Sequence, residues 1–168
     1  MRAGILVIGP LLAKINKAKV SLPGGCAIGA RPVDIHLDFL RSVGYSNKVI
    51  NGYVESKSKK KKQKIIYEFK KISVGATETA ILNSVLSNRE VKLKNIAIEP
   101  EIIDLINFLN IAGANIKFIS KRTLVIKGIK KLNSINYSVM PDRIEAGTYI
   151  MASIITKSPL VLENIHTD

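Results

Sequence analysis

One stretch of the sequence combines a thiol, a cation and several glycines within a short loop. Residues 21–36 read SLPGGCAIGARPVDIH, and they hold Cys26, the only cysteine of the chain. Cys26 follows a Pro-Gly-Gly turn, and Arg31 and Pro32 stand shortly after it, where a helix is expected to begin. Residues of these types in this order are typical of a loop that places a reactive group beside an anion.

The chemistry of this loop follows from its residue types. Glycines allow the backbone to bend sharply and to approach a ligand closely. Pro32 suits a first helical turn, where free amides bind anions, and Arg31 adds a planar charged fork for phosphate or carboxylate. Nearby positive charge lowers the pKa of a thiol, so Cys26 is a candidate acid or nucleophile. The alternative is that Cys26 is a buried, inert small side chain.

Helices and strands alternate along the chain and would position this loop. Their alternation indicates an α/β fold. Gly44 and Gly113 suit positions just after helices, Pro100 suits a helix start, and Asp142 begins a D-x-x-E capping box. The apolar spacing and the turn residues predict helices over 4–15, 32–43, 76–88, 100–112 and 143–156. They predict strands over 18–22, 47–55, 64–72, 90–96, 115–119, 123–127, 134–139 and 159–165.

These elements recur. The segment from Phe39 to Gly44 matches the segment from Phe108 to Gly113, which lies 69 residues later, and residues 91–96 match residues 160–165 at the same spacing. A weaker match relates residues 19–22 to residues 90–93 at a spacing of 71. A unit of about 70 residues is too long for a solenoid repeat and favours an architecture of repeated supersecondary units. The pattern begins and ends inside a unit, so we expect an architecture that is truncated at both ends.

Composition restricts the location of the protein. A single cysteine excludes an internal disulfide and fits a reducing compartment. No run reaches the roughly 18 apolar residues that a membrane span needs. The apolar N-terminal run is interrupted by Gly9-Pro10 and lacks a cleavage site, so we interpret it as a buried helix and not a signal peptide. We therefore expect a cytoplasmic protein with no membrane partner.

The formal charge of +13 raises the question of nucleic-acid binding. The densest cluster, residues 57–64, contains no aromatic residue for base stacking and lies between two strand-like runs, 52–55 and 65–69. A solvated hairpin tip explains such a cluster, so we expect no nucleic-acid partner. A basic nucleic-acid-binding α/β module stays the alternative from a different functional class.

The sequence resembles the UDP-N-acetylglucosamine 1-carboxyvinyltransferase family of enolpyruvyl transferases, over essentially its whole length. Four runs carry the resemblance: 21–34, 71–78, 99–104 and 141–148. The related 3-phosphoshikimate enolpyruvyl transferases share the fold but lack the Pro-Gly-Gly-Cys loop, so Cys26 argues against them.

The resemblance implies a fold of two domains, each built from three βαβαββ units as an inside-out α/β barrel, with the active site between them. Residues 1–139 would be the latter part of the first domain, and residues 140–168 the start of the second. The 168 residues would be less than half of a family member.

The resemblance also implies a reaction. The enolpyruvyl group of phosphoenolpyruvate passes to the 3′-hydroxyl of UDP-N-acetylglucosamine, and phosphate leaves, by addition and elimination. This is the first committed step of peptidoglycan synthesis, and with it of cell-wall biogenesis, cell shape and cell division. It needs no metal and no cofactor. The two substrates, together with the remainder of such an enzyme, are the partners that we expect.

Family positions that match this chain imply a set of site residues. Cys26 matches the loop cysteine that donates the proton, can form an adduct with phosphoenolpyruvate and is alkylated by fosfomycin. The implied substrate contacts are Arg2, Arg31, Pro32, Val33, Asp34, Ile35, Lys71, Ser73, Val74 and Gly75. Simpler interpretations stay open. Arg31 would pair only with Asp34, Asp34 would only be a helix-start charge, and Lys71 would be a surface lysine. His36 has no acidic or cysteine partner at useful spacing, so we interpret it as structural.

Several groups that the family uses have no counterpart in these residues. These are a Lys-Asn pair that contacts phosphoenolpyruvate, a later aspartate that serves as the base, and an arginine of the second domain. We therefore expect no turnover by the isolated chain. An inactive gene remnant is a further alternative.

Overall fold

The structure is a computed structural model, and it describes residues 2–24, 33–59 and 64–165. The chain divides into two compact units, Met1–Ile135 and Asn136–Asp168, which we describe separately. The expected boundary between enzyme domains at 139/140 stays a prediction, because a division into compact units does not identify domains of a larger enzyme.

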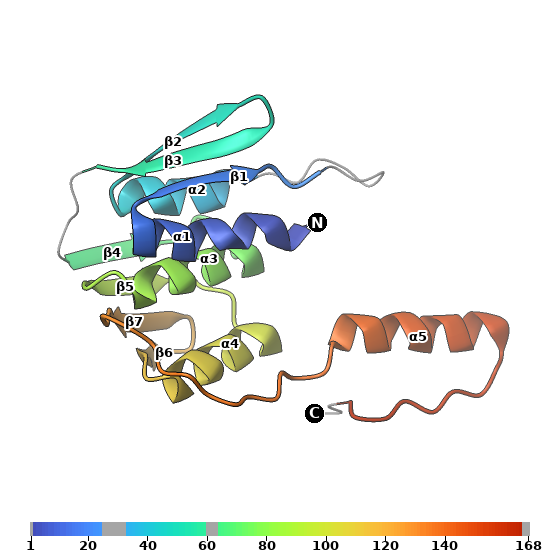
Figure 1. Ribbon diagram of the computed structural model, residues 1–168. Coiled ribbons are helices and arrows are strands. Elements are labelled where there is room, and N and C mark those ends of the chain that lie inside the picture. Colours follow the sequence, from blue (N-terminus) through green and yellow to red (C-terminus); the bar gives the residue numbers. More distant parts are fainter. Residues whose placement is uncertain (1, 25–32, 60–63, 166–168) are drawn as a thin grey trace. The chain divides into compact units, whose positions relative to one another are not determined.

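The first part of unit one is a three-stranded antiparallel sheet with helices packed against it (Figure 1). A 3-10 helix, η1 (Arg2–Val7), continues into α1 (Ile8–Ile15) and strand β1 (Lys17–Ser21). Helix α2 (Asp34–Ser42) precedes β2 (Tyr45–Ile50) and β3 (Tyr53–Ser58). The strand order is β1-β3-β2.

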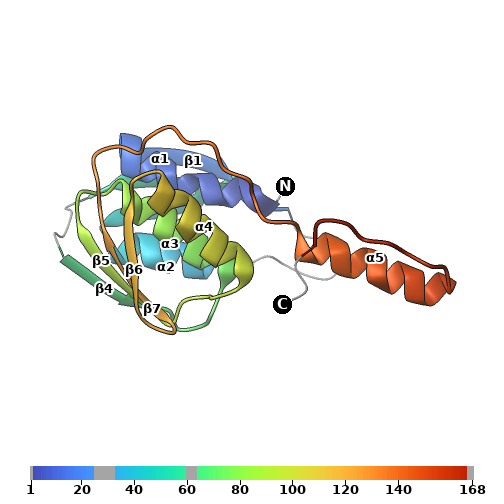
Figure 2. The same cartoon turned by 90° about the horizontal axis from the view of Figure 1, so that it is seen from below.

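The second part of unit one is a complete βαβαββ unit. In chain order it contains β4 (Lys64–Glu68), α3 (Val74–Val85), β5 (Glu90–Lys94), α4 (Pro100–Ile111), β6 (Asn115–Ser120) and β7 (Thr123–Lys127). Its sheet has the order β4-β5-β7-β6, with β4 parallel to β5 and the other pairs antiparallel. Figure 2 shows the helices of both parts gathered on the same side of this sheet.

The repeat in the sequence is therefore a repeat in the structure. The order β1-β3-β2 reproduces β5-β7-β6, and α1 and α2 take the places of α3 and α4. Gly44 and Gly113 both have positive φ, 100° and 97°, directly after α2 and α4. The α/β fold class and the repeated units are confirmed.

The two parts share one core. Phe39 of α2 is fully buried, and its ring lies 5.4 Å from the ring of Tyr67 and 6.5 Å from that of Phe69, both from the second part. Helices α1 and α3 approach so closely that a Cβ on Gly9 would lie 2.8 Å from the carbonyl oxygen of Thr79. Helices α1 and α2 of the first part thus pack against the second part.

Two expectations for strands in unit one are wrong. Residues 47–55 are not one strand, because Asn51 and Gly52, with φ of 47° and 76°, make a tight turn between β2 and β3. The lysine-rich segment is not a hairpin tip, because β3 and β4, on either side of it, belong to different sheets. The segment is a connection between the two repeat units.

Unit two contains helix α5 (Arg143–Thr156). The side chain of Asp142 accepts hydrogen bonds from the amides of Ile144 and Glu145 at 2.8 and 3.3 Å, so the predicted helix start is confirmed. The strands expected over 134–139 and 159–165 are absent from the described residues, where these segments form no ladder. A strand needs a neighbour to pair its backbone, and neither segment has one there.

Candidate functional site

Three of the predicted site residues, Cys26, Arg31 and Pro32, lie outside the described residues. Arg2 is the first residue of η1. The other predicted contacts lie at the starts of α2 and α3, where the structure describes them fully.

The start of α2 carries three predicted contacts in succession. Val33 is the residue before the helix and is partly buried, and Asp34 is the exposed first residue of the helix. Ile35 packs against the core. A carboxylate in the first turn interacts favourably with the helix dipole. Asp34 therefore stabilises the start of α2 whether or not it also binds a ligand.

The start of α3 carries the second group. Ser73 caps the helix, since its Oγ accepts a hydrogen bond from the amide of Ala76 at 3.3 Å. Val74 and Gly75 are the first two helical residues, and their amides have no carbonyl one turn earlier to bind. The hydroxyl hydrogen of Ser73 is not used by the cap, so this turn can offer two amides and a hydroxyl to an anion. Lys71, two residues before the cap, is exposed.

His36 joins the two helix starts. Its ring is buried, with 8% of the residue exposed, and its Nδ1 lies 2.9 Å from the Oγ1 of Thr79 on α3. A Cβ built on Gly75 would lie 3.2 Å from the Cε1 of His36 and 3.4 Å from its Nε2. The ring thus lies directly against the backbone of the predicted anion-binding turn.

The element that contains Arg2 reaches the same place. The Cδ2 of Leu6, in η1, lies 3.9 Å from the same Cβ position on Gly75. The starts of α2 and α3 and the helix η1 therefore meet at one point of unit one, although they are far apart in the sequence.

The arrangement suits binding of an extended anion. Helix-start amides of α3 and the exposed Lys71 supply positive potential, and Asp34 supplies an acceptor for hydroxyl or imide groups. A phosphate at the start of α3 would gain charge-assisted hydrogen bonds from backbone amides. The described residues contain no group of three or more His, Cys, Asp or Glu side chains that could hold a metal ion.

His36 is interpreted from the sequence as a structural residue, and its burial is consistent with that interpretation. Its place directly after Asp34 and Ile35 showed only that it lies next to one of the two predicted binding segments. Its partner, Thr79, is 43 residues away and could not be identified by spacing.

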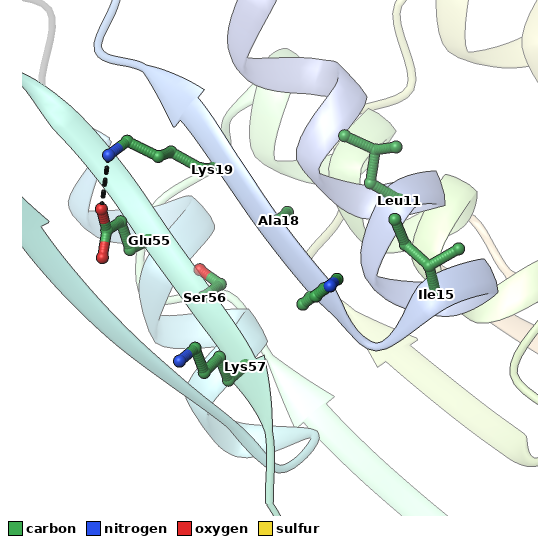
Figure 3. A pocket seen from close by; sticks show the side chains of 8 residues that line it. Leu11, Ile15, Ala18, Lys19, Glu55, Ser56 and Lys57 are labelled. Atoms are coloured by element: carbon green, nitrogen blue, oxygen red, sulfur yellow. Dashed lines mark ion pairs between the residues drawn. The ribbon is translucent and has the colours of Figure 1, made fainter.

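A groove on unit one lies elsewhere. It has a volume of about 360 Å³ and is lined by residues of α1, β1 and β3 (Figure 3). None of its lining residues is a predicted site residue, so it is a separate feature. Across the described part of the chain, no helix has the length and hydropathy that a transmembrane segment requires.

Comparison with known proteins gives three results. The family model described as EPSP synthase (3-phosphoshikimate 1-carboxyvinyltransferase) matches residues 1–168. A UDP-N-acetylglucosamine 1-carboxyvinyltransferase of Pelagibacter ubique is 55% identical over 98% of this chain, and one of Caldanaerobacter subterraneus is 48% identical over all of it. The chain spans about 40% of the length of each of these relatives.

Solved structures show the same fold. The enolpyruvyl transferase NikO from Streptomyces tendae matches with a TM-score of 0.71 and 22% identity, over 88% of this chain and 35% of that one. An EPSP synthase from Acinetobacter baumannii matches with a TM-score of 0.68 and 17% identity, over 99% of this chain and 38% of that one. The enolpyruvyl transferase fold is therefore confirmed, and the chain belongs to the EPSP synthase (3-phosphoshikimate 1-carboxyvinyltransferase) family.

Proposed function

We propose that this chain is part of a UDP-N-acetylglucosamine 1-carboxyvinyltransferase and supplies most of its nucleotide-sugar site. One observation carries the proposal: the segments with Val33–Ile35 and Ser73–Gly75 meet at His36, in a chain 55% identical to such an enzyme. A 3-phosphoshikimate enolpyruvyl transferase is a poorer fit, because the relatives from Pelagibacter ubique and Caldanaerobacter subterraneus are both named UDP-N-acetylglucosamine 1-carboxyvinyltransferases.

The proposed reaction follows the chemistry of the substrates. The 3′-hydroxyl of UDP-N-acetylglucosamine gives its proton to a base, for which the resemblance implies an aspartate without a counterpart in these residues, and its oxygen bonds to C2 of phosphoenolpyruvate. C3 takes a proton in the same step, for which Cys26 is the proposed donor. Loss of a proton from C3 and of phosphate from C2 then restores the double bond. Arg31, Arg2 and the start of α3 would stabilise the anionic groups during both steps.

The role in the cell follows from the reaction. We place the protein in peptidoglycan synthesis, and through it in cell-wall biogenesis and cell division, with Cys26 as the site of fosfomycin alkylation. A reducing, cytoplasmic setting belongs to the same proposal, because the chain has a single cysteine that must stay reduced to act.

Binding of UDP-N-acetylglucosamine to the 168-residue chain tests the proposal. NMR titration should shift the amide signals of Val33–Ile35 and Ser73–Gly75. Loss of one charge-assisted contact in the Lys71→Ala or Asp34→Ala variant should weaken binding by about 10- to 100-fold, which corresponds to about 1.5–3 kcal/mol. Lys117→Ala is the matched control, because Lys117 is an exposed lysine of β6 outside the predicted site.

Two results would contradict the proposal. One is an absence of binding by a chain that is folded by its amide spectrum. The other is binding of nonspecific DNA that falls steeply with salt and is unaffected by UDP-N-acetylglucosamine, which would favour the nucleic-acid-binding alternative. A phosphate-release assay on the same sample should show no turnover, and turnover would refute the view that further residues are required.

A further inference from the structure

The four-stranded sheet of unit one has its helices on one side only in the described part of the unit. Figure 2 shows them beside the face on which Val91, Leu93, Leu124 and Ile126 are buried, with at most 1% exposure each. The βαβαββ unit is complete, so β4, β5, β7 and β6 all contribute side chains to the opposite face.

The strand register aligns the side chains of this opposite face, which we call the outer face, in three rows. The rows consist of Lys64, Glu90, Lys127 and Asn115, of Ile66, Lys92, Val125 and Lys117, and of Glu68, Lys94 and Thr123. Each of these residues is exposed or partly exposed. The rows contain five lysines and two glutamates, so the outer face has a formal charge of +3.

Both glutamates of the outer face are already paired. The carboxylate of Glu90 lies 3.3 Å from the Nζ of Lys64, and that of Glu68 lies 3.6 Å from the Nζ of Lys94. Lys127 stands opposite Glu90 in the ladder, but the ion pair of that carboxylate is with Lys64. Among the described residues Lys127 forms no ion pair, so its charge is not compensated.

The middle row places lysines beside exposed apolar side chains. Ile66, which is 63% exposed, stands opposite Lys92, and Val125 stands between Lys92 and Lys117. Neither lysine forms an ion pair with another residue that the structure describes. Neighbouring strands lie about 4.8 Å apart, so the Cα atoms of the two lysines are about 10 Å from each other. Positive charge and apolar surface therefore alternate across this row.

The composition of the outer face indicates the kind of surface that it fits. Its rows contain no arginine, which reads bases as a planar fork, and no aromatic residue on which a base could stack. Tyr67 of β4 belongs to the other face, where its ring lies 5.4 Å from that of Phe39. Lysines with apolar neighbours match an anionic lipid surface, which offers phosphates to ammonium groups and an apolar layer directly beneath them.

We propose that the outer face is a docking surface for an anionic lipid bilayer. Lys92, Lys117 and Lys127 contact lipid phosphates, and Ile66 enters the interface between head groups and acyl chains. The expectation of no membrane partner rests on the lack of a spanning segment, and a peripheral contact of this kind needs none. The proposal is independent of the nucleotide-sugar site, because no residue of the outer face is a predicted site residue.

Cosedimentation with vesicles tests the proposal. The 168-residue chain should sediment with vesicles made of equal parts of phosphatidylcholine and phosphatidylglycerol, and not with vesicles of phosphatidylcholine alone. Binding should fall as salt is added, because salt screens the attraction between exposed charges. A variant that combines Lys92→Gln, Lys117→Gln and Lys127→Gln should lower the partition coefficient by about 100-fold, since each lysine near an anionic surface contributes about fivefold.

Matched variants separate docking by the outer face from attraction by net charge. A control that combines Lys17→Gln, Lys48→Gln and Lys57→Gln removes the same charge from the sheet β1-β3-β2, and it should lower the partition coefficient by less than about fivefold. Ile66→Ser should lower it by about threefold or more through loss of apolar contact. Ile50→Ser, at a residue of β2 that is 45% exposed, should leave it unchanged.

Four outcomes would overturn the proposal. One is a chain that is folded by its amide spectrum and stays in solution with anionic vesicles at low salt. Another is an equal loss of binding in the two triple variants, which would make net charge the cause. Equal sedimentation with neutral vesicles would show adsorption by apolar surface elsewhere. Nonspecific duplex DNA that displaces the chain from vesicles through the same three lysines would make a nucleic acid the occupant.

Discussion

The Nδ1 of His36 lies 2.9 Å from the Oγ1 of Thr79, inside the core of unit one. Both residues are buried, and the contact joins the first turn of α2 to the second turn of α3. It therefore holds the two predicted nucleotide-binding segments in a fixed relation.

Thr79→Val should test this contact, because valine keeps the shape of threonine and removes only the hydroxyl. Loss of the hydroxyl leaves the His36 Nδ1 without this partner, which should lower the free energy of unfolding by about 1–3 kcal/mol. UDP-N-acetylglucosamine affinity should fall too, even where the variant is fully folded. Thr148→Val on exposed α5 is the control, and equal losses in both variants would rule out a special role for the buried contact.

Gly75→Ala should destabilise the chain, although alanine is the better helix former by about 1 kcal/mol. The new methyl group would meet the buried ring of His36 at 3.2 Å, and the bond to Thr79 limits the movement of that ring. In a His36→Ala background the same change should become neutral or stabilising, as a double-mutant cycle by urea unfolding can show. Gly147→Ala, in α5 with no atom within 4 Å of the new methyl, should cost nothing.

Gly9→Ala should reduce stability through the packing of α1 on α3. Its methyl group would lie 2.8 Å from the backbone oxygen of Thr79, which cannot move without shifting α3. We expect a loss of about 1–3 kcal/mol in the free energy of unfolding. Gly4→Ala, where nothing lies within 4 Å, should differ little from the parent chain, and a comparable loss there would contradict this explanation.

Stability should decline in alkali because of Tyr67. Burial first, and then the charge of Asp38, raises the pKa of Tyr67 above its ordinary value of 10.0. Tyr67 ionises at lower pH in the unfolded chain than in the folded chain. Its contribution to the free energy of unfolding is therefore complete below the ordinary pKa and is lost as the pH rises through the pKa that Tyr67 has in the folded chain. Urea unfolding between about pH 8 and about 11 should show a shallower decline for Tyr67→Phe than for the parent. Tyr53→Phe, at a tyrosine that is 43% exposed, should follow the parent.

Much of the fold could be predicted from local signals. Gly44, Gly113, Pro100 and Asp142 marked helix ends correctly, because each has a backbone or capping property that only such positions require. The spacing of 69 residues between Phe39 and Phe108 predicted a repeat that the strand order confirms.

The failures have physical causes. Asn51-Gly52 is a strong signal for a two-residue hairpin turn, and neglecting it merged β2 with β3. Residues 159–165 have the pattern of a strand, but pattern alone does not make one where no neighbour pairs with it. Contacts between distant residues, such as His36 with Thr79, depend on tertiary packing and had no signal in the sequence. The roles of Cys26, Arg31 and Pro32 stay predictions, since these residues lie outside the described part of the chain.

The boundary between the two repeats in unit one has a consequence for folding. Hydrogen bonds cross it from Asn83 to the carbonyl of Gly9 at 3.0 Å and from Arg89 to the carbonyl of Val43 at 2.7 Å. The repeats of a solenoid can fold one by one, since each contacts only its neighbours through an interface of its own. Here the two halves share one hydrophobic core. Unit one should therefore unfold in a single cooperative transition, and neither half should stay folded when the other unfolds.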